Sequence, residues 1–269
     1  MPPLELLSSR LDALGRVLLG YSGGVDSALL AVVGTRALGP GRFLAVIGRS
    51  ASYPAAQHAA ALAIARDFAV PLLEVTTGEL DDPRYLANPV DRCFYCKDEL
   101  WTRLAAVAAA RGFDAVIDGT NADDLHEHRP GLRAAATHGI RSPLAELGWG
   151  KDDIRAASRD LGLATWDAPA APCLSSRVAY GVAITPGRLA AVERGEAWLR
   201  ELGVVGDLRV RHHGDRARLE LSPAQFPLVR AAWAEVERTF HGLGFHAVEL
   251  DPRGYRRGSL LQVLDGTSG

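Results

Sequence analysis

The chain has 269 residues, a length that suits one large domain or two of ordinary size. Its 48% hydrophobic and 23% charged residues are typical of a soluble globular protein, and a formal net charge of −2 argues against nucleic acid as the main partner. Because the sequence has no run of about 18 apolar residues and no basic segment before an apolar one at its start, we expect neither a membrane span nor a secretory signal.

Short apolar segments alternate with helical segments through the first 165 residues. We expect strands at 17–19, 43–47, 71–75 and 115–117, helices at 4–14, 28–38, 55–68, 98–111 and 151–161, and a loop at 76–92. Buried strands that alternate with helices form parallel sheets covered on both faces. This order therefore predicts an α/β domain with a doubly wound parallel sheet over residues 1–165.

The order of elements changes after residue 165. Residues 166–186 are rich in proline and predict an ordered functional loop that joins two domains. The next segments predict a helix at 187–202, strands at 208–212 and 217–221, a helix at 223–241 and a strand at 245–250. This order predicts a smaller C-terminal α+β domain over residues 187–269.

The stretch Tyr21-Ser22-Gly23-Gly24-Val25-Asp26-Ser27 joins the first strand to the first following helix. Its glycines allow the backbone to come close to a ligand, and the N–H groups at a helix start favour an anion. A carboxylate beside a phosphate is unfavourable unless a cation lies between them, so Asp26 indicates Mg²⁺ that bridges to a polyphosphate. The stretch is neither a Walker A loop nor a Gly-x-Gly-x-x-Gly loop. It resembles the pyrophosphate loop (PP-loop) of the N-type ATP pyrophosphatases, which adenylate their substrates.

Two other polar segments follow predicted strands. Residues 48–54, which include Arg49, follow the second strand, and Asp118–Asp124 follow the fourth. Ligands of open parallel sheets bind at the carboxyl ends of the strands. We therefore expect Ser22–Ser27, Arg49 and Asp118–Asp124 to gather along one edge.

The three cysteines, Cys93, Cys96 and Cys173, are an odd number, which fits cytoplasmic thiols better than a disulfide framework. A structural zinc would need a fourth ligand, and no histidine lies at finger spacing from these residues. A redox dithiol would use Cys93 and Cys96 alone and leave Cys173 unexplained. Three thiolates with one open iron position make a 4Fe-4S cluster that can bind hydrosulfide. The residues favour this cluster and leave the zinc and redox or free-thiol alternatives open.

Several charged residues of the second half are candidates for binding. Arg209 and Arg211 share one face of a predicted strand and could grip a phosphate, although a solvated strand face is an equal alternative. Arg177, close to Cys173 in sequence, could lower the pKa of that thiol or hold an anion. Glu220 could bind a metal or face solvent.

Over nearly its whole length the sequence resembles the LarE family, the ATP-dependent sulfur transferases of nickel-pincer nucleotide synthesis. The stretches that carry the resemblance are Tyr21–Ser27, Arg92–Lys97, Asp118–Asp124, Arg129–Gly131, Arg141–Leu144, Trp166–Pro169, Cys173–Arg177, Tyr180-Gly181, Arg209–Glu220 and Gly254–Ser259. The first stretch specifies only the superfamily, whereas the Cys-Leu-Ser-Ser-Arg loop and the C-terminal stretches are more specific.

The resemblance implies an enzyme that adenylates the carboxylates of pyridinium-3,5-biscarboxylic acid mononucleotide, releases pyrophosphate and leaves thiocarboxylates for the nickel-pincer cofactor of lactate racemase-type enzymes. Its implied cofactors are ATP, Mg²⁺ and a 4Fe-4S cluster held by Cys93, Cys96 and Cys173, with a sacrificial Cys173 as the alternative sulfur donor. It also implies a cytoplasmic homo-oligomer whose C-terminal domain binds the substrate.

Roles for single residues follow from the loop, the strand ends and the resemblance together. The residues expected to bind ATP are Ser22, Gly23, Gly24, Val25, Asp26, Ser27, Arg49, Gly119 and Asp124. The resemblance implies that Arg209, Arg211 and Arg256 hold the substrate phosphate, that Glu220 lies near the transferred sulfur or a metal, and that Asp26, Cys173 and Glu220 are catalytic. Ala197 departs from the family pattern, because a second acidic residue is expected there as a partner of Glu220.

Two rival functions share parts of this pattern. Enzymes that thiolate tRNA combine the same loop with a C-x-x-C pair and a third cysteine, but they normally show a basic surface and often additional C-x-x-C zinc modules, and neither is visible here. A degenerate pyrophosphatase domain would bind ATP or AMP without releasing pyrophosphate, and the intact Asp26 argues against it.

Overall fold

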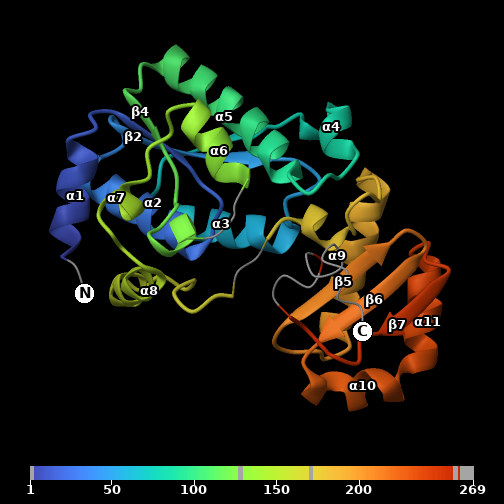
Figure 1. Ribbon diagram of the computed structural model, residues 1–269. Coiled ribbons are helices and arrows are strands. Elements are labelled where there is room, and N and C mark those ends of the chain that lie inside the picture. Colours follow the sequence, from blue (N-terminus) through green and yellow to red (C-terminus); the bar gives the residue numbers. More distant parts are fainter. Residues whose placement is uncertain (1–2, 127–129, 170–171, 257–259, 261–269) are drawn as a thin grey trace. The chain divides into compact units, whose positions relative to one another are not determined.

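The protein is described by a computed structural model that covers residues 3–126, 130–169, 172–256 and 260. The chain divides into two compact units (Figure 1). Unit 1 contains the residues up to Asp82 together with Asp91–Ala171, and unit 2 contains Pro83–Val90 together with the residues from Pro172 onward. The segment 166–186, predicted to join two domains, therefore spans one boundary between the units, and a short segment of the N-terminal half belongs to unit 2.

Unit 1 is built on a parallel sheet with the strand order β3-β2-β1-β4. Residue Val17 of β1 pairs with Phe43 of β2 on one side and with Ala115 of β4 on the other. The strands are β1 (Val17–Gly20), β2 (Phe43–Arg49), β3 (Leu72–Thr76) and β4 (Ala115–Ile117). The predicted parallel α/β class is confirmed, and each strand expected in this part of the chain is present.

Helices cover both faces of this sheet because its side chains alternate between the faces. Val17 and Leu19 join the core under α1, α2, α3 and α8, whereas Leu18 joins the core under α5 and α6. The helices are α1 (Leu4–Asp12), α2 (Val25–Leu38), α3 (Ala55–Asp67), α5 (Arg92–Arg111), α6 (Pro130–Thr137), α7 (Pro143–Glu146) and α8 (Lys151–Asp160), with 3₁₀ turns η1 (Glu79–Asp81) and η2 (Asp123–His126). No helix in the described ranges is long and apolar enough to cross a membrane.

Unit 2 contains a second sheet with the order β5-β6-β7. Strand β6 pairs antiparallel with β5 and parallel with β7. Its elements are α4 (Pro83–Leu86), η3 (Leu174–Arg177), α9 (Pro186–Glu201), β5 (Leu208–His213), β6 (Arg216–Leu221), η4 (Pro223–Gln225), α10 (Phe226–Ala231), α11 (Trp233–Gly242) and β7 (Ala247–Leu250). The single helix expected at 223–241 is wrong, because Ala232 adopts φ −97° and ψ 16° and interrupts it.

The segment Pro83–Val90 is held within unit 2 by two buried polar side chains. Asn88, at φ +53°, donates its side-chain amide to the carbonyl oxygens of Val178, Ala179 and Val182 at 2.8–3.3 Å. The Tyr85 hydroxyl forms a hydrogen bond of 2.5 Å with the Ser175 hydroxyl. These contacts bring the segment to the loop that follows Cys173, an association that no periodic sequence pattern indicates.

Candidate nucleotide pocket and arginine cluster

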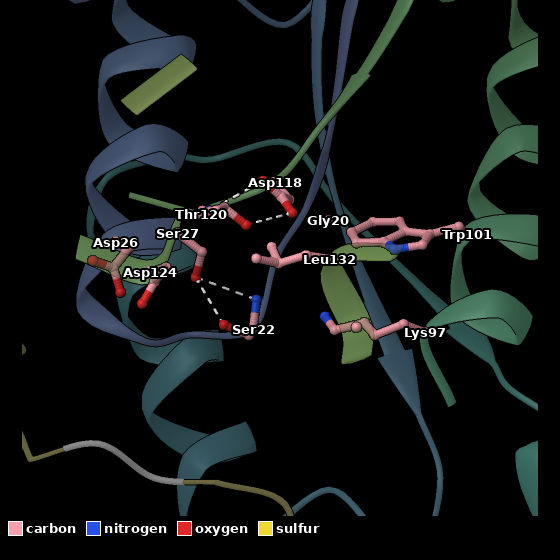
Figure 2. Close-up of a pocket in the computed structure, with 12 residues that line it drawn as sticks. Gly20, Ser22, Asp26, Ser27, Lys97, Trp101, Asp118, Thr120, Asp124 and Leu132 are labelled. Carbon is pink, nitrogen blue, oxygen red and sulfur yellow. Dashed lines mark hydrogen bonds between the residues drawn. The ribbon is translucent and has the colours of Figure 1, made fainter. Parts of the chain in front are cut away.

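A cavity of about 240 Å³ lies at the carboxyl edge of the unit 1 sheet, between the ends of β1 and β4 (Figure 2). The chain continues from β1 to β2 on one side of β1, whereas β4 lies on its other side, so the strand order reverses at this point of the sheet. Ligands of open parallel sheets bind at such a switch point. The residues that line it are Gly20, Ser22, Asp26, Ser27, Lys97, Trp101, Asp118, Gly119, Thr120, Asp124, Gly131 and Leu132. Five of the residues predicted to bind ATP are therefore brought together: Ser22, Asp26, Ser27, Gly119 and Asp124.

The loop after β1 is ordered by its own serines. The Ser27 hydroxyl accepts a hydrogen bond from the Ser22 backbone N–H at 3.3 Å and donates to the Gly24 carbonyl at 3.1 Å. Gly23 has φ +72°, and a Cβ there would lie 2.6 Å from the Ala61 Cβ, so the loop requires glycine at this position. Helix α2 begins at Val25 with no side chain capping its first turn, which directs N–H donors toward an anion.

The loop after β2 and the first turn of α3 support the loop after β1 from outside the cavity. Tyr53 and Gln57 donate hydrogen bonds of 2.9 and 2.7 Å to the Ser22 carbonyl oxygen. Burial, with a smaller contribution from Glu74, raises the pKa of Tyr53 to about 12, so its hydroxyl stays protonated as a donor. Arg49 instead forms an ion pair of 3.2 Å with Glu74 and is not among the residues that line the cavity. Its predicted contact with ATP stays a prediction.

The polar loop after β4 forms the opposite wall. Asp118 accepts hydrogen bonds from the Thr120 hydroxyl at 2.8 Å and the Ser142 hydroxyl at 2.7 Å. Gly119 allows the two loops to touch, because a Cβ there would lie 3.0 Å from the Ser27 backbone nitrogen. The Asn121 side chain donates to Asp26 Oδ1 at 3.1 Å, so the two loops are also joined by a hydrogen bond.

Asp26 forms an ion pair with Lys151, a residue that the sequence pattern did not single out. The Lys151 ammonium lies 2.7 Å from both carboxylate oxygens of Asp26. Lys151 is the first residue of α8, and its backbone N–H donates to Asp123 Oδ2 at 2.7 Å. The carboxylate predicted to bind Mg²⁺ is therefore neutralised by a side chain of the same unit.

The chemistry of this wall fits Mg²⁺ that arrives with ATP. Asp26, Asp118 and Asp124 present the oxygen ligands that Mg²⁺ prefers. Within the described ranges no group of three or more His, Cys, Asp or Glu side chains is arranged to hold a metal ion. A nucleotide-bound Mg²⁺ needs only one or two protein carboxylates, because phosphates and waters supply its other ligands.

Helix α5 contributes two residues that sequence reasoning missed, Lys97 and Trp101 (Figure 2). The Lys97 ammonium lies 4.9 Å from the centre of the Trp101 ring. Gly20 makes room for that ring, because a Cβ at Gly20 would lie 2.7 Å from Trp101 Cζ3. A glycine at the end of a strand, with a lysine and a tryptophan on one helix face, was the available signal.

The cysteine pair lies within α5 rather than before it. The prediction that this helix begins at residue 98 is wrong, because it begins at Arg92, a residue that is only 4% exposed. Cys93 and Cys96 are three residues apart in the helix and therefore share a face. Cys93 is exposed, Cys96 is half-buried, and Cys173, in unit 2 just before η3, is half-buried. A common cluster on the three thiols stays a prediction.

Unit 2 contains a buried arginine cluster around Arg177, Arg209 and Arg211, which are only 4–8% exposed. The alternative of a solvated strand face for Arg209 and Arg211 is therefore wrong. Arg211 Nε donates to Glu220 Oε2 at 2.8 Å, and Arg211 Nη1 donates to the Ser176 carbonyl at 2.9 Å. Glu220 thus contacts an arginine in a buried setting rather than facing solvent.

Arg177 organises the main chain of the Cys173 loop. Its Nη1 donates to the carbonyl oxygens of Pro172 and, at 3.1 Å, Cys173. Its Nε and Nη2 donate to Glu196 at 3.0 and 3.1 Å. Glu196, the residue before Ala197, is therefore a second carboxylate of this cluster.

The cluster as a whole suits an anion. Three guanidinium groups are opposed by the carboxylates of Glu196 and Glu220. Burial, followed by repulsion from Arg177, lowers the pKa of Arg209. Its guanidinium lies 5.2 Å from the centre of the Tyr255 ring, and Arg256 lies 3.5 Å from the buried carboxylate of Asp251. An anionic ligand would relieve the unfavourable positive charge at Arg209.

Known proteins are similar to this chain both around the loop after β1 and over nearly its whole length. Residues 9–83, which include the loop after β1, match the family model described as NAD synthase. The chain is 43% identical over 97% of its length to an uncharacterised protein of Synechocystis, and covers 97% of that protein. It is 34% identical over 96% of its length to the pyridinium-3,5-bisthiocarboxylic acid mononucleotide synthase of Lactiplantibacillus plantarum, covering 93% of it. An uncharacterised protein of Methanocaldococcus jannaschii is 28% identical over 90% of the chain and 91% of its own length.

Proposed function

The chain belongs to the family of the pyridinium-3,5-bisthiocarboxylic acid mononucleotide synthase, and we propose that it is the corresponding ATP-dependent sulfur transferase. Its substrate is pyridinium-3,5-biscarboxylic acid mononucleotide, whose two carboxylates become thiocarboxylates for the nickel-pincer cofactor. The observation that carries this proposal is the 34% identity over 96% of the chain. It is supported by the cavity beside the PP-loop in unit 1 and by the buried arginine cluster in unit 2, which suit a nucleotide and a phosphorylated substrate respectively.

The cavity of unit 1 accounts for the use of ATP. A free carboxylate is a poor electrophile with no good leaving group, and adenylation supplies AMP as that group. The first turn of α2, Ser22 and Ser27 would bind the pyrophosphate, Gly119 and Asp124 would lie beside AMP, and Asp26 would hold Mg²⁺. Mg²⁺ held by Asp26 would neutralise the negative charge that develops on the departing pyrophosphate.

The arginine cluster of unit 2 would bind the phosphate of the mononucleotide. Arg209 and Arg211 are the main donors in this proposal, and Arg256 is a third. The contact of Arg211 with Glu220 fixes the plane of its guanidinium before substrate arrives. Glu220 acts here as a positioning carboxylate near the transferred sulfur.

We assign the sulfur to a 4Fe-4S cluster with Cys93, Cys96 and Cys173 as its thiolate ligands. Cysteine thiolates are the ordinary ligands of such clusters, and three of them leave one iron open. When bound, the cluster supplies that iron as the carrier of a transferable hydrosulfide. The alternative is a sacrificial Cys173 that gives up its own sulfur. The thiols and the ATP requirement favour a cytoplasmic protein, and the family resemblance favours a homo-oligomer without a nucleic acid or membrane partner.

One experiment tests the reaction. Anaerobic protein is incubated with the mononucleotide, Mg²⁺·ATP and sulfide, and products are followed by mass spectrometry and a pyrophosphate assay. We expect sulfur to replace one oxygen of the first carboxylate and then one oxygen of the second, with one pyrophosphate released per replacement. Pyrophosphate release without a thiolated mononucleotide would contradict the proposal, and thiolation of tRNA in a parallel reaction would favour the nucleic acid rival.

A second experiment tests the sulfur donor. Protein purified without oxygen is analysed for iron and acid-labile sulfide, and we expect about four irons per chain. Cys93→Ser should lose this iron while the chain remains folded. Iron-free protein that completes a single turnover, with loss of one sulfur from Cys173 in its mass spectrum, would instead establish the sacrificial route.

A further inference from the structure

Lysine is nearly absent from this chain. Of its 30 basic residues only Lys97 and Lys151 are lysines, and the remaining 28 are arginines. Both lysines lie at the nucleotide pocket, because Lys97 lines it and Lys151 contacts Asp26, which lines it. Lysine and arginine differ chemically, since an ammonium is a compact charge on a flexible stem and a guanidinium is a planar fork that binds a carboxylate bidentately. The pocket is thus the one place where this sequence uses an ammonium.

The contact of Lys151 conflicts with the predicted role of Asp26. The ammonium lies 2.7 Å from both carboxylate oxygens, and Oδ1 also accepts the Asn121 amide at 3.1 Å. Mg²⁺ coordinates carboxylate oxygens at about 2.0–2.1 Å, and two cations on the same oxygens repel strongly. Asp26 therefore cannot keep its full contact with Lys151 and also serve Mg²⁺.

The structure allows Lys151 to leave Asp26 without a change in α8. Its backbone N–H is fixed by Asp123 at 2.7 Å, so the start of the helix is held independently of the side chain. The side chain itself is 38% exposed and contains four rotatable methylene groups beyond that anchor. An arginine at this position would bind both oxygens of Asp26 with two parallel N–H donors and would exchange less readily.

We propose that Lys151 is an exchangeable counter-ion of Asp26. In the ATP-free protein its ammonium neutralises the carboxylate and disfavours uptake of a free divalent cation. When Mg²⁺·ATP binds, Lys151 releases Asp26 and its ammonium contacts the phosphates at the mouth of the pocket. This inference rests on the proposed use of ATP in the unit 1 pocket, and it is independent of which acid is adenylated.

The scarcity of lysine makes the exchange directly observable. Protein grown with ¹³Cε-labelled lysine gives two lysine signals in a carbon–proton NMR spectrum, and Lys97→Arg and Lys151→Arg assign them. We expect the Lys151 signal to shift when Mg²⁺ and α,β-methylene-ATP, which cannot be cleaved to AMP, are added. An unchanged Lys151 signal at saturating nucleotide, with binding measured by calorimetry, would overturn the proposal, as would a failure of the wild-type protein to bind this nucleotide.

Binding of Mn²⁺, measured by electron paramagnetic resonance, is the second readout. Without nucleotide, we expect Lys151→Met to bind Mn²⁺ about three- to tenfold more tightly than the wild type, because the competing ammonium is gone. Lys151→Arg should keep the low affinity, Lys97→Met should leave it nearly unchanged, and Asp26→Asn should abolish the gain when combined with Lys151→Met. Equal Mn²⁺ affinity in wild type and a folded Lys151→Met would contradict the exchange.

These readouts separate the inference from the proposed function, because neither measures sulfur transfer. Protein that shows the Lys151 shift and the Mn²⁺ gain but makes no thiolated mononucleotide would retain the inference and lose the function. Protein that makes the thiolated product with no Lys151 shift would retain the function and lose the inference. Circular dichroism and thermal unfolding confirm the fold of each variant.

Discussion

Arg211 and Glu220 form an ion pair of 2.8 Å in which both side chains are almost completely buried, at 7% and 2% side-chain exposure. Removal of one partner breaks this ion pair while the other charge stays buried. We expect Glu220→Ala to lower the free energy of unfolding by about 3 kcal/mol, and Glu220→Gln, which keeps an acceptor for Arg211, by less. Chemical denaturation measures both, with the exposed Glu237→Ala as the matched control. A loss in Glu220→Ala no larger than that of the control would contradict the buried pair.

Because Arg211 takes part in this buried pair, Arg209 is a better probe of substrate binding than Arg211. Arg211→Ala should weaken mononucleotide binding, but it should also destabilise unit 2 because the buried Glu220 loses its ion pair with Arg211. Arg209→Met keeps that pair, and we expect it to lower the affinity for the mononucleotide about 10- to 100-fold, the value of a charge-assisted hydrogen bond. Calorimetry with the mononucleotide and, separately, with ATP checks this. A fall in ATP affinity of the same size would show a general loss of structure instead.

Asp26 is expected to be essential for pyrophosphate release. Asp26→Ala removes the carboxylate that the proposal assigns to Mg²⁺ and should reduce release below detection, while Glu74→Ala, a change at an acidic residue outside the cavity lining, should leave most of it. A continuous pyrophosphate assay with saturating Mg²⁺·ATP and mononucleotide makes the comparison. Substantial turnover by Asp26→Ala would refute the assigned role.

The first unit could be predicted from the sequence because its strands are apolar and local. Segments such as Phe43–Ile47 are buried on both faces and have no other stable environment in a soluble chain. The loop after β1 was equally readable, because two glycines and an aspartate between a strand and a helix are typical of a loop that binds a phosphate with a cation. The helical position of Cys93 was missed, because no acidic residue lies in the first turn of α5 to mark its start.

The partners of charged residues could not be predicted. Lys151 is 125 residues from Asp26, and Glu196 is 19 residues from Arg177, so no local spacing connects either pair. Ala197 departs from the family pattern, and the sequence did not single out the neighbouring Glu196, because which residue of α9 reaches Arg177 depends on helix rotation. Pro83–Val90 shows the same limit, since Asn88 contacts carbonyls about 90 residues away.

Gly119 should be sensitive even to a methyl group. A Cβ there would lie 3.0 Å from the Ser27 backbone nitrogen and 3.3 Å from Asp26 Cβ, so Gly119→Ala must move the two loops apart. We expect about tenfold weaker ATP binding with a small change in stability, because the strain falls on a surface pocket rather than on the core. Gly41→Ala, whose Cβ would meet nothing within 4 Å, is the control. Equal ATP affinity in both variants would show that the loops tolerate the extra atom.

His212 should make unit 2 sensitive to mild acid. Burial, with smaller contributions from Arg188 and His213, lowers its pKa to about 4, and its ring packs 4.8 Å from that of Phe245. As the pH falls below the unfolded pKa of about 6.5, the unfolded chain takes up a proton that the folded chain refuses until about pH 4. The contribution of His212 to the free energy of unfolding is therefore fully present above pH 7. It should fall by up to about 3 kcal/mol on acidification to pH 4.

The variant His212→Phe tests this pH dependence, because it keeps an aromatic ring against Phe245 and removes the titrating group. Burial also lowers the pKa of His213 to about 4, so the variant should lose part of the acid sensitivity rather than all of it. Urea denaturation at several pH values between 7.5 and 4.5 measures the slope, with the exposed His246→Gln as a control of unchanged slope. If the free energy of unfolding of His212→Phe changed with pH as steeply as that of the wild type, the prediction would be contradicted. Groups other than His212 would then account for the acid sensitivity.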